Sequence, residues 1–505
     1  MNQKKAGILL SYTSEAIKIL TSLLYTPIML RLLGQSEYGL YQLVYSVVSY
    51  LGLLSLGFTS SYVRFFALAK EKDTEDEVAR LNGMFMSIFL VIAGIAAVCG
   101  GIMVGNIRGI FRTGLSDSEY PTARILMILM IFNLSVSFPN SVFNCIISAN
   151  ERFFFQRLLT VLQNLLNPFL TLPILLMGYG SIGMVAVTTA ITLAKLGVDM
   201  WYVFHVLKAK FIFGGFNFYL LKDIWAFTFF IFLNQIIDQV NWSVDRFLLG
   251  RMIGTSAVAV YGLGAQINTM YVQMSTTVSS VFAPQINRMV VQKKDNRELS
   301  QLFIKVGRIQ FILLSLILTG FIFIGHPFME LWGGSKSYGE SYYVALLLMV
   351  PSTVPLIQNL GIEIQRAKNM HRARSVVYFC IAVANVLVSI PLIRKFGIVG
   401  APAGTAISIV IGNIFFMNWY YKYKIGLIIS AFWKEIFSIF PAIIAPAILG
   451  AALQKSVTID SVVGILIWAS LYTIVFAISM WILGMNQFEK SLIKNAICKL
   501  QRVKR

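Results

Sequence analysis

Long apolar stretches alternate with short polar segments along the whole chain. About fourteen of them reach the roughly 20 residues that a helix needs to cross the hydrocarbon core of a bilayer. They lie approximately at 8–33, 40–62, 83–105, 123–147, 158–178, 182–206, 224–249, 257–283, 306–330, 341–364, 374–394, 399–421, 432–453 and 461–484. Because backbone groups in lipid have no water to bond, each span is predicted to be a helix. The pattern predicts an all-α integral membrane protein with about 14 transmembrane helices.

Composition supports lipid as the main solvent. Apolar types make up 57% of the 505 residues and charged types only 13%, whereas about a quarter of the residues of a soluble protein are charged. The first stretch begins near Ile8, is too long for the core of a signal peptide and lacks a small-residue cleavage site. We therefore expect it to be retained as the first span.

The net charge of +20 would raise the question of nucleic acid in a soluble protein. Here the Lys and Arg residues gather in short segments between spans, so no nucleic-acid partner is expected. With the N-terminus in the cytoplasm, the inner segments, which include Arg308, hold about three times as many Lys and Arg as the outer ones. The bias predicts a multi-pass protein with both termini cytoplasmic and with its basic loops against membrane lipids.

The chain also resembles itself at an offset of about 217 to 220 residues. The matches are Tyr179-Gly180-Ser181-Ile182-Gly183 with Phe396-Gly397-Ile398-Val399-Gly400, Asn150 with Asn369, Asn167 with Asn385, Pro173 with Pro391, and Gly34 and Tyr41 with Gly254 and Tyr261. They predict two parallel six-helix bundles at 1–215 and 216–425, an arrangement found in transporters. Two additional transmembrane helices would occupy 426–484. Residues 485–505 would form a basic amphipathic cytoplasmic tail, or else a solvated one.

Charged and amide side chains inside the spans are the candidates for function. A charge at the centre of a membrane helix costs about 3 kcal/mol, so it usually faces a wet cavity or a partner. The candidate cavity residues are Glu15 and Lys18 in span one, Arg64 at the inner end of span two, Asn234, Asp238 and Asn241 in span seven, and Gln266 in span eight. Span six adds Lys195 and Asp199, four residues apart.

Spans one and seven begin the two repeats, so their polar faces are expected to meet across a hydrated central cavity. Lys18 would attract an anionic headgroup such as a diphosphate, and the amides would bond sugar hydroxyls. An alternative stays open, in which Glu15–Lys18 and Lys195–Asp199 neutralise each other locally. Likewise, Arg64 either meets a headgroup or only marks topology.

Signatures of catalysis are absent from the sequence. There is no Walker A motif, and the three His residues are far apart, so neither a catalytic residue, a cofactor nor a metal is expected. A membrane-embedded polymerase or glycosyltransferase would need a large outer loop or clustered carboxylates, and the sequence has neither. The chain is not expected to be an enzyme.

A short turn carries a family resemblance. Leu33-Gly34-Gln35-Ser36-Glu37-Tyr38-Gly39-Leu40-Tyr41 resembles the Leu-Gly-x-x-x-Tyr-Gly-x-Tyr turn after the first helix of polysaccharide-biosynthesis flippases, which move lipid-linked oligosaccharides. The Gly180/Gly183 and Gly397/Gly400 turns are similar to theirs as well. These flippases belong to the multidrug/oligosaccharidyl-lipid/polysaccharide exporter superfamily.

The resemblance implies a MATE-like fold of two bundles that exports by alternating access. Its implied cargo is a polyprenyl-diphosphate-linked oligosaccharide, flipped across the bacterial plasma (inner) membrane for surface polysaccharide such as lipopolysaccharide. An ion gradient or the membrane potential would supply the energy, with Asp238 and Glu15 as candidate coupling residues. A polysaccharide polymerase and glycosyltransferases would be partners. Family members often line the cavity with Arg. In this chain the cationic candidates are few, mainly Lys18 with Arg64 nearby. A drug/cation antiporter and a peptidoglycan-precursor flippase of the same superfamily remain alternatives.

Overall fold

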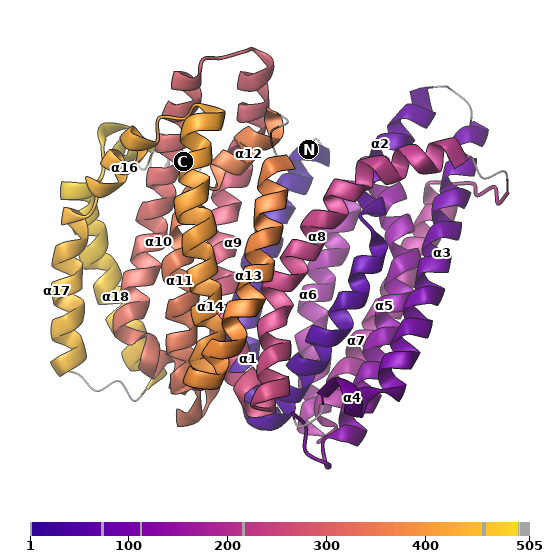
Figure 1. The fold of residues 1–505 in the computed structure, drawn as a ribbon, viewed down its shortest axis with the longest axis horizontal. Coiled ribbons are helices and arrows are strands. Elements are labelled where there is room, and N and C mark those ends of the chain that lie inside the picture. The colour runs from indigo at the N-terminus through magenta and orange to yellow at the C-terminus, as the bar shows by residue number, and fades with distance from the viewer. Residues whose placement is uncertain are drawn as a thin grey trace, which may run out of the picture. The chain divides into compact units, whose positions relative to one another are not determined.

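The computed structural model describes residues 3–71, 75–111, 114–214, 218–368, 370, 372–456, 461–492 and 494. Within these ranges the regular elements are all helical, as the apolar spans predict. The helices, labelled in Figure 1, are α1 Gln3–Val48, α2 Phe58–Glu71, α3 Glu75–Gly105, α4 Ile107–Phe111, α5 Tyr120–Ala149, α6 Phe153–Leu176, α7 Gly180–Trp201, α8 Phe218–Met252, α9 Thr255–Val291, α10 Asn296–Gly333, α11 Ser341–Ile357, α12 Leu360–Ala367, α13 Arg372–Phe396, α14 Gly400–Ile409, α15 Met417–Tyr420, α16 Ile429–Phe437, α17 Pro441–Ser456 and α18 Val462–Ser479.

The helices are long and apolar enough for a multi-pass membrane protein. Among the described residues, 9 helices qualify as spans, or 10 if the bent pair α16 and α17 counts as one. Two of the nine, Ile17–Ser55 and Val376–Ile425, each cover two predicted spans. Gly34 and Gly397 mark the breaks inside them, with φ of 75° and 63°, values that favour glycine. The integral membrane fold is confirmed, whereas the count of 14 spans is not.

Two predicted spans are interrupted. The predicted span 432–453 is not one continuous helix, because α16 and α17 meet at a bend of 42° before Pro441, although the bent pair together is apolar enough for one span. Proline has no N–H to donate and starts a helix more readily than it continues one. The predicted span 40–62 ends at Ser55, where Leu56 and Gly57 turn the chain with positive φ. Arg64 therefore lies on a separate helix, α2.

Backbone proximity groups the chain into two units. The first is Met1–Gly262 with Ile390–Ala401, and the second is Leu263–Ser389 with Pro402–Arg505. This grouping places α8 in the first unit, whereas the sequence assigns 216–425 to the second bundle. The predicted domain boundaries at 215, 425 and 484 remain predictions.

Hydrogen bonds join the loops at one end of the first unit. Glu119 Oε1 accepts from Ser36 Oγ at 2.6 Å and from Thr255 Oγ1 at 2.8 Å. Glu37 Oε1 accepts from the backbone N–H of Ser181 at 2.6 Å, which caps the start of α7. The turn at 33–41, which carries the family resemblance, thus binds three later loops. All of these loops are predicted to lie on the outer face.

Hydrogen bonds stabilise the ionised form of Glu119 at this end of the first unit. Burial acts to raise the pKa of Glu119, but the hydrogen bonds from Ser36, Ser116 and Thr255 outweigh burial and lower the pKa below its ordinary 4.5. The loop between α4 and α5 is therefore held by a carboxylate that stays ionised at neutral pH.

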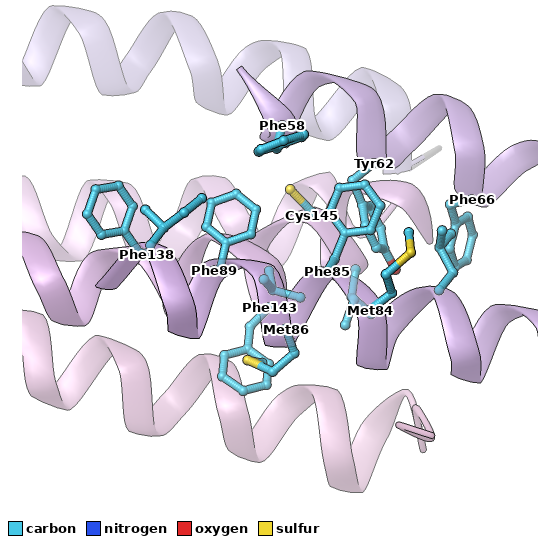
Figure 2. Close-up of a cluster of buried hydrophobic side chains, with 14 of the residues drawn as sticks. Phe58, Tyr62, Phe66, Met84, Phe85, Met86, Phe89, Phe138, Phe143 and Cys145 are labelled. Carbon is cyan, nitrogen blue, oxygen red and sulfur yellow. The ribbon is translucent and has the colours of Figure 1, made fainter. Parts of the chain in front are cut away.

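The opposite end of the first unit is packed around aromatic side chains (Figure 2). Tyr62 and Phe66 of α2 meet Phe85 and Phe89 of α3 and Phe143 of α5 in one buried cluster. The rings of Tyr62 and Phe85 are 5.1 Å apart and edge-on, the arrangement that aromatic pairs prefer. Loops that are predicted to be cytoplasmic adjoin this cluster.

The two predicted repeats share local geometry. In α6, Thr171 Oγ1 donates to Asn167 Oδ1 at 3.1 Å, and in α13, Ser389 Oγ donates to Asn385 Oδ1 at 3.0 Å. The positions correspond at the offset that the sequence matches give. Because the same contact recurs at the same place in each repeat, these bonds support the predicted duplication.

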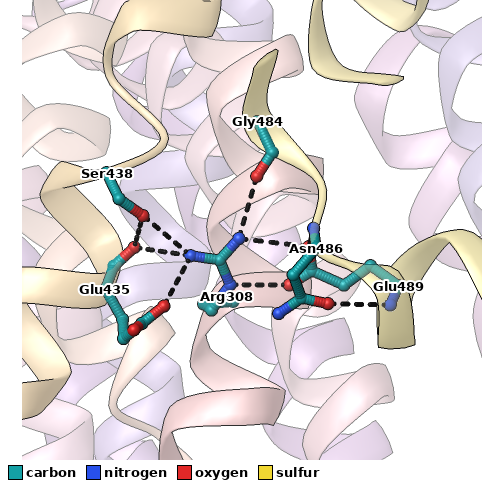
Figure 3. Close-up of polar contacts among 6 residues, drawn as sticks. All are labelled: Arg308, Glu435, Ser438, Gly484, Asn486 and Glu489. Atoms are coloured by element: carbon teal, nitrogen blue, oxygen red, sulfur yellow. Dashed lines mark hydrogen bonds and ion pairs between the residues drawn. The ribbon is translucent and has the colours of Figure 1, made fainter. Parts of the chain in front are cut away.

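A buried arginine fastens the C-terminal helices of the second unit (Figure 3). Arg308 of α10 is 3% exposed and donates to Glu489 Oε1 at 2.7 Å, Glu435 Oε2 at 3.0 Å and the Gly484 carbonyl at 2.8 Å. The interpretation of Arg308 as a basic loop residue is therefore wrong, since hydrogen-bonded carboxylates make its burial possible. The rest of the predicted tail, beyond 494, lies outside the described residues.

Candidate functional site

An ion pair lies inside a membrane-spanning helix of the first unit. Lys195 Nζ and Asp199 Oδ2 of α7 are 3.4 Å apart. Asp199 is fully buried, whereas the Lys195 side chain is 22% exposed. The spacing of four residues places both side chains on one helix face, as the sequence predicts. The pair therefore presents a partly accessible cation backed by a buried anion.

Amides of α5 and α6 complete this site. Asn144 Nδ2 donates to Asp199 Oδ2 at 3.2 Å, and Gln156 Nε2 donates to the Asn144 carbonyl at 3.0 Å. Asn140, one helical turn from Asn144, is 7% exposed. The Oδ1 atom of Asn140 accepts no hydrogen bond from any described residue. Buried amide oxygens usually find a donor, so this one is an acceptor for a polar group that enters the site.

The amides of α5 were missed by the sequence analysis, although a signal was present. Asn140 and Asn144 are four residues apart within an apolar span, so they occupy one helix face. These two residues mark the span at 123–147 as a second amide-rich span beside span seven. What the sequence does not give is the pairing of α5 with α7.

The predicted cavity residues of α1 and α2 lie in the first unit. The side chain of Lys18 on α1 is exposed, and so is that of Arg64 on α2. Glu15 is on α1, but its side chain is outside the described residues. Exposure is what a headgroup-binding cation requires, and the roles of these three residues remain predictions.

The amide-rich face of α8 is described only in part. The side chains of Asn234, Asp238 and Asn241 are outside the described residues. Their neighbour Gln239 donates from Nε2 to Ser49 Oγ at 2.6 Å and to Ser243 Oγ at 2.7 Å. One position of this face therefore anchors the chain at the end of α1. The assignment of the other three to a cavity stays a prediction.

One further polar position completes the predicted set. Gln266 of α9 is half-buried in the second unit. Outside that set, Asp245 of α8 is 1% exposed and accepts from Tyr261 Oη at 2.8 Å. Among the described residues, no three His, Cys, Asp or Glu side chains come together as a metal site.

Comparison with known proteins extends over most of the chain. The chain is 20% identical over 492 residues to EpsK, an uncharacterized membrane protein of Bacillus subtilis (strain 168), covering 95% of each chain. It is 18% identical over 393 residues to a proposed O-antigen transporter of Shigella flexneri, covering 77% of this chain and 90% of that one. The fold is similar to that of the lipid II flippase MurJ in an inward closed conformation, with a TM-score of 0.74, 16% identity, and coverage of 96% of this chain and 99% of that one.

The profile of one protein family matches residues 5–290, which include the turn at 33–41, the ion pair on α7 and the amide-rich face of α8. This match covers more than half of the chain. The chain therefore belongs to the polysaccharide biosynthesis protein family.

Proposed function

We propose that this protein is a flippase that moves a polyprenyl-diphosphate-linked oligosaccharide across the bacterial plasma membrane for surface polysaccharide synthesis. Membership of the polysaccharide biosynthesis family supports this proposal, as does the similarity to a proposed O-antigen transporter. The fold shared with the lipid II flippase MurJ is compatible with it. Transport is by alternating access, with both termini in the cytoplasm.

The observation that carries the proposal is the polar site between α5 and α7. A fully buried carboxylate, a partly accessible Lys195 and the buried amide of Asn140 occupy two helices that are apolar enough to span a membrane. Placing such groups in a membrane is costly, so they are usually kept for a wet pathway, a polar cargo or a coupled ion. A protein that only anchored others in the bilayer would have no use for them.

The cargo chemistry assigns roles to the predicted cavity residues. Lys18 and Arg64 attract the diphosphate as cations, and Asn234, Asn241 and Gln266 bond sugar hydroxyls. Asp238 and Glu15 are the carboxylates that couple transport to an ion gradient. Glycosyltransferases that build the cargo and a polymerase that extends it are the corresponding partners.

The test uses a strain that lacks the chromosomal gene and carries variants on a plasmid. Lys18→Ala is expected to abolish surface polysaccharide at normal protein level, while Lys18→Arg, which keeps the charge, retains most of it. The readouts are surface polysaccharide by gel and lipid-linked oligosaccharide retained in the membrane. Normal polysaccharide with Lys18→Ala removes Lys18 from the site.

The same deletion strain separates the alternatives. Loss of surface polysaccharide with accumulated lipid-linked oligosaccharide supports the proposed cargo. Greater accumulation of a cationic drug with unchanged polysaccharide would instead identify a drug antiporter. Loss of viability with accumulated lipid-linked peptidoglycan precursor would identify a flippase for that precursor.

A further inference from the structure

A cavity opens at the end of the first unit opposite the turn at 33–41. Its volume is about 550 Å³. The last turns of α2, the first turns of α3, the end of α5 and the segment Leu207–Lys210 form its walls. All of these parts belong to the same unit. The ion pair on α7 is not among its lining residues, so the cavity is distinct from the polar site described above.

The walls of the cavity are held by specific bonds. Asn82 of α3 is 1% exposed, accepts from Tyr62 Oη at 2.5 Å and donates from Nδ2 to the Lys210 carbonyl at 3.0 Å. The backbone N–H of Ile212 donates to the Ala79 carbonyl at 3.0 Å. These bonds fix the segment that follows α7 along the start of α3.

A close approach of the backbones confirms that this arrangement is built into the sequence. A Cβ atom on Gly83 would lie 2.1 Å from the Ile212 carbonyl oxygen, a contact that no side chain tolerates. Only glycine allows the segment to lie this close to α3. The aromatic cluster of α2, α3 and α5 adjoins the cavity, and Phe66 belongs to both.

The charged side chains that line the cavity are of one sign among the residues that the structure describes. Three of the described lining residues are lysines, Lys70, Lys208 and Lys210, and none is Asp or Glu. All three side chains are exposed. Lys70 Nζ lies 6.0 Å from the centre of the Phe66 ring, which holds this ammonium above an apolar wall. The amide of Asn150 adds a neutral polar group. Such a set attracts an anion.

The remaining walls are apolar, formed by side chains such as Val78, Ile146 and Leu207. A small inorganic anion has no use for such walls. A lipid uses both parts, because its phosphate meets the lysines and its first carbons lie against the apolar side chains. Basic pockets between membrane helices on the cytoplasmic side are suited to anionic lipid headgroups, and the predicted orientation places this cavity on that side.

We propose that this cavity, the lysine pocket, binds the phosphate of a lipid headgroup through Lys70, Lys208 and Lys210. The phosphate has two possible sources, an anionic phospholipid of the inner leaflet or the polyprenyl diphosphate of the cargo. The second source rests on the proposed function, and the first does not. Both use the same lysines and the same apolar wall.

The test measures equilibrium binding to the full-length protein, purified in a neutral detergent. The probes are dihexanoyl phosphatidylglycerol, farnesyl diphosphate, zwitterionic dihexanoyl phosphatidylcholine and inorganic phosphate. We expect the two anionic lipids to bind more tightly than the other two probes, and their binding to weaken with salt. In competition, tighter binding by farnesyl diphosphate than by phosphatidylglycerol identifies the cargo as the source of the phosphate. The opposite order of affinities identifies the phospholipid.

Two variants locate the site. The triple variant Lys70→Gln, Lys208→Gln, Lys210→Gln is expected to bind about a hundredfold more weakly, since each lysine near a lipid phosphate contributes roughly a factor of five. A matched triple, Lys293→Gln, Lys422→Gln, Lys424→Gln, neutralises three exposed lysines of the second unit and should bind normally. Ala209→Phe fills the cavity and keeps all three lysines, and it should also lose binding.

Three results would overturn the lysine pocket. The first is that neither anionic lipid binds the unaltered protein. The second is that the two triple variants bind the anionic lipids equally well. The third is that Ala209→Phe binds them normally. Inorganic phosphate bound as tightly as the lipids would overturn the role of the apolar wall. Export of polysaccharide by the same variants is measured separately, so a failure of this inference leaves the proposed function standing, and the reverse also holds.

Discussion

At the scale of single residues, the ion pair on α7 explains how a charge is tolerated inside a membrane helix. Asp199 has no exposure, and its charge is balanced by Lys195 and by the amide of Asn144. Removal of one partner from a buried pair leaves the other charge uncompensated, which costs more than the pair contributes. Loss of Lys195 should therefore destabilise the fold more than loss of Asp199, because Asp199 is the more deeply buried of the two charges.

We expect Lys195→Met to lower the stability of the protein by about 2 kcal/mol, because it leaves Asp199 buried without its cation. The double variant Lys195→Met, Asp199→Asn removes both charges and should recover most of that loss. If the pair also serves transport, polysaccharide export stays low in the double variant. Thermal unfolding in detergent and surface polysaccharide measure the two effects. Full recovery of both would assign the pair to local neutralisation alone.

Glu119 gives a second prediction at this scale, which concerns pH. Its pKa in the folded protein is lower than the ordinary 4.5, so its ionised form stabilises the fold above that value, and the contribution disappears as pH falls through the lowered pKa. Glu119→Gln should therefore lower the thermal midpoint at pH 7, and the difference from the unaltered protein should shrink below about pH 4. Glu340→Gln, at an exposed glutamate of the second unit, is the control. A difference that is the same at both pH values would contradict the role of the carboxylate charge.

The sequence predicts part of the candidate site and misses the rest for a physical reason. Local spacing along one helix is visible in the sequence, and the Lys195–Asp199 pair is predicted on that basis. Contacts between helices depend on packing, which periodicity does not encode. Asn144 reaches Asp199 from a helix 55 residues away in the chain, and nothing in either segment points to the other.

At the scale of elements, Arg308 shows how the C-terminal helices are attached. Its guanidinium bonds the segment after α18 through Gly484 and Glu489, and the end of α16 through Glu435 (Figure 3). One side chain of α10 thus fixes two separate segments. From the sequence Arg308 is predicted only as one of the inner basic residues, and its carboxylate partners lie more than a hundred residues away in the chain.

We expect Arg308→Met to destabilise the protein by about 3 to 5 kcal/mol, because Glu489, which is 4% exposed, would be left as an unpaired buried charge. The segment after α18 should become accessible to protease before the remaining helices do. Limited proteolysis with detection of a C-terminal tag measures this release. Arg297→Met, at an exposed arginine in the first turn of α10, is the matched control. Equal protection of the tag in the two variants would contradict the fastening role.

Elements are predicted from the sequence where hydropathy alone decides, and less well where backbone geometry intervenes. Apolar length identifies α5, α6 and α7 within five residues of their bounds, whereas α3 begins at Glu75, eight residues before the predicted start at 83. It does not register the turn at Leu56 and Gly57, which makes α2 a separate helix, or the bend before Pro441. Both breaks lie inside apolar stretches, so the average hydropathy passes over them.

At the scale of the whole molecule, the fold predicts that successive loops lie on alternate sides of the membrane, which can be tested. Within the first unit, Ser36, Glu119 and Thr255 are joined at one end, and Lys70 and Lys208 line a cavity at the other. The loops therefore sort into two sets in the order that the span assignment predicts. The excess of Lys and Arg in alternate segments predicts that the second set lies in the cytoplasm.

Cysteine labelling tests both the orientation and the number of spans. In a variant without native Cys, Ser116→Cys and Ser335→Cys are expected to react with an impermeant maleimide on intact spheroplasts, while Lys208→Cys and Lys293→Cys should react only after permeabilisation. All four positions have exposed side chains. Reaction of Lys208→Cys in place of Ser116→Cys would invert the first unit. An odd number of spans between residues 116 and 335 would leave Ser335→Cys protected while Ser116→Cys reacts, and the parallel repeat and the prediction of fourteen spans would then fall together.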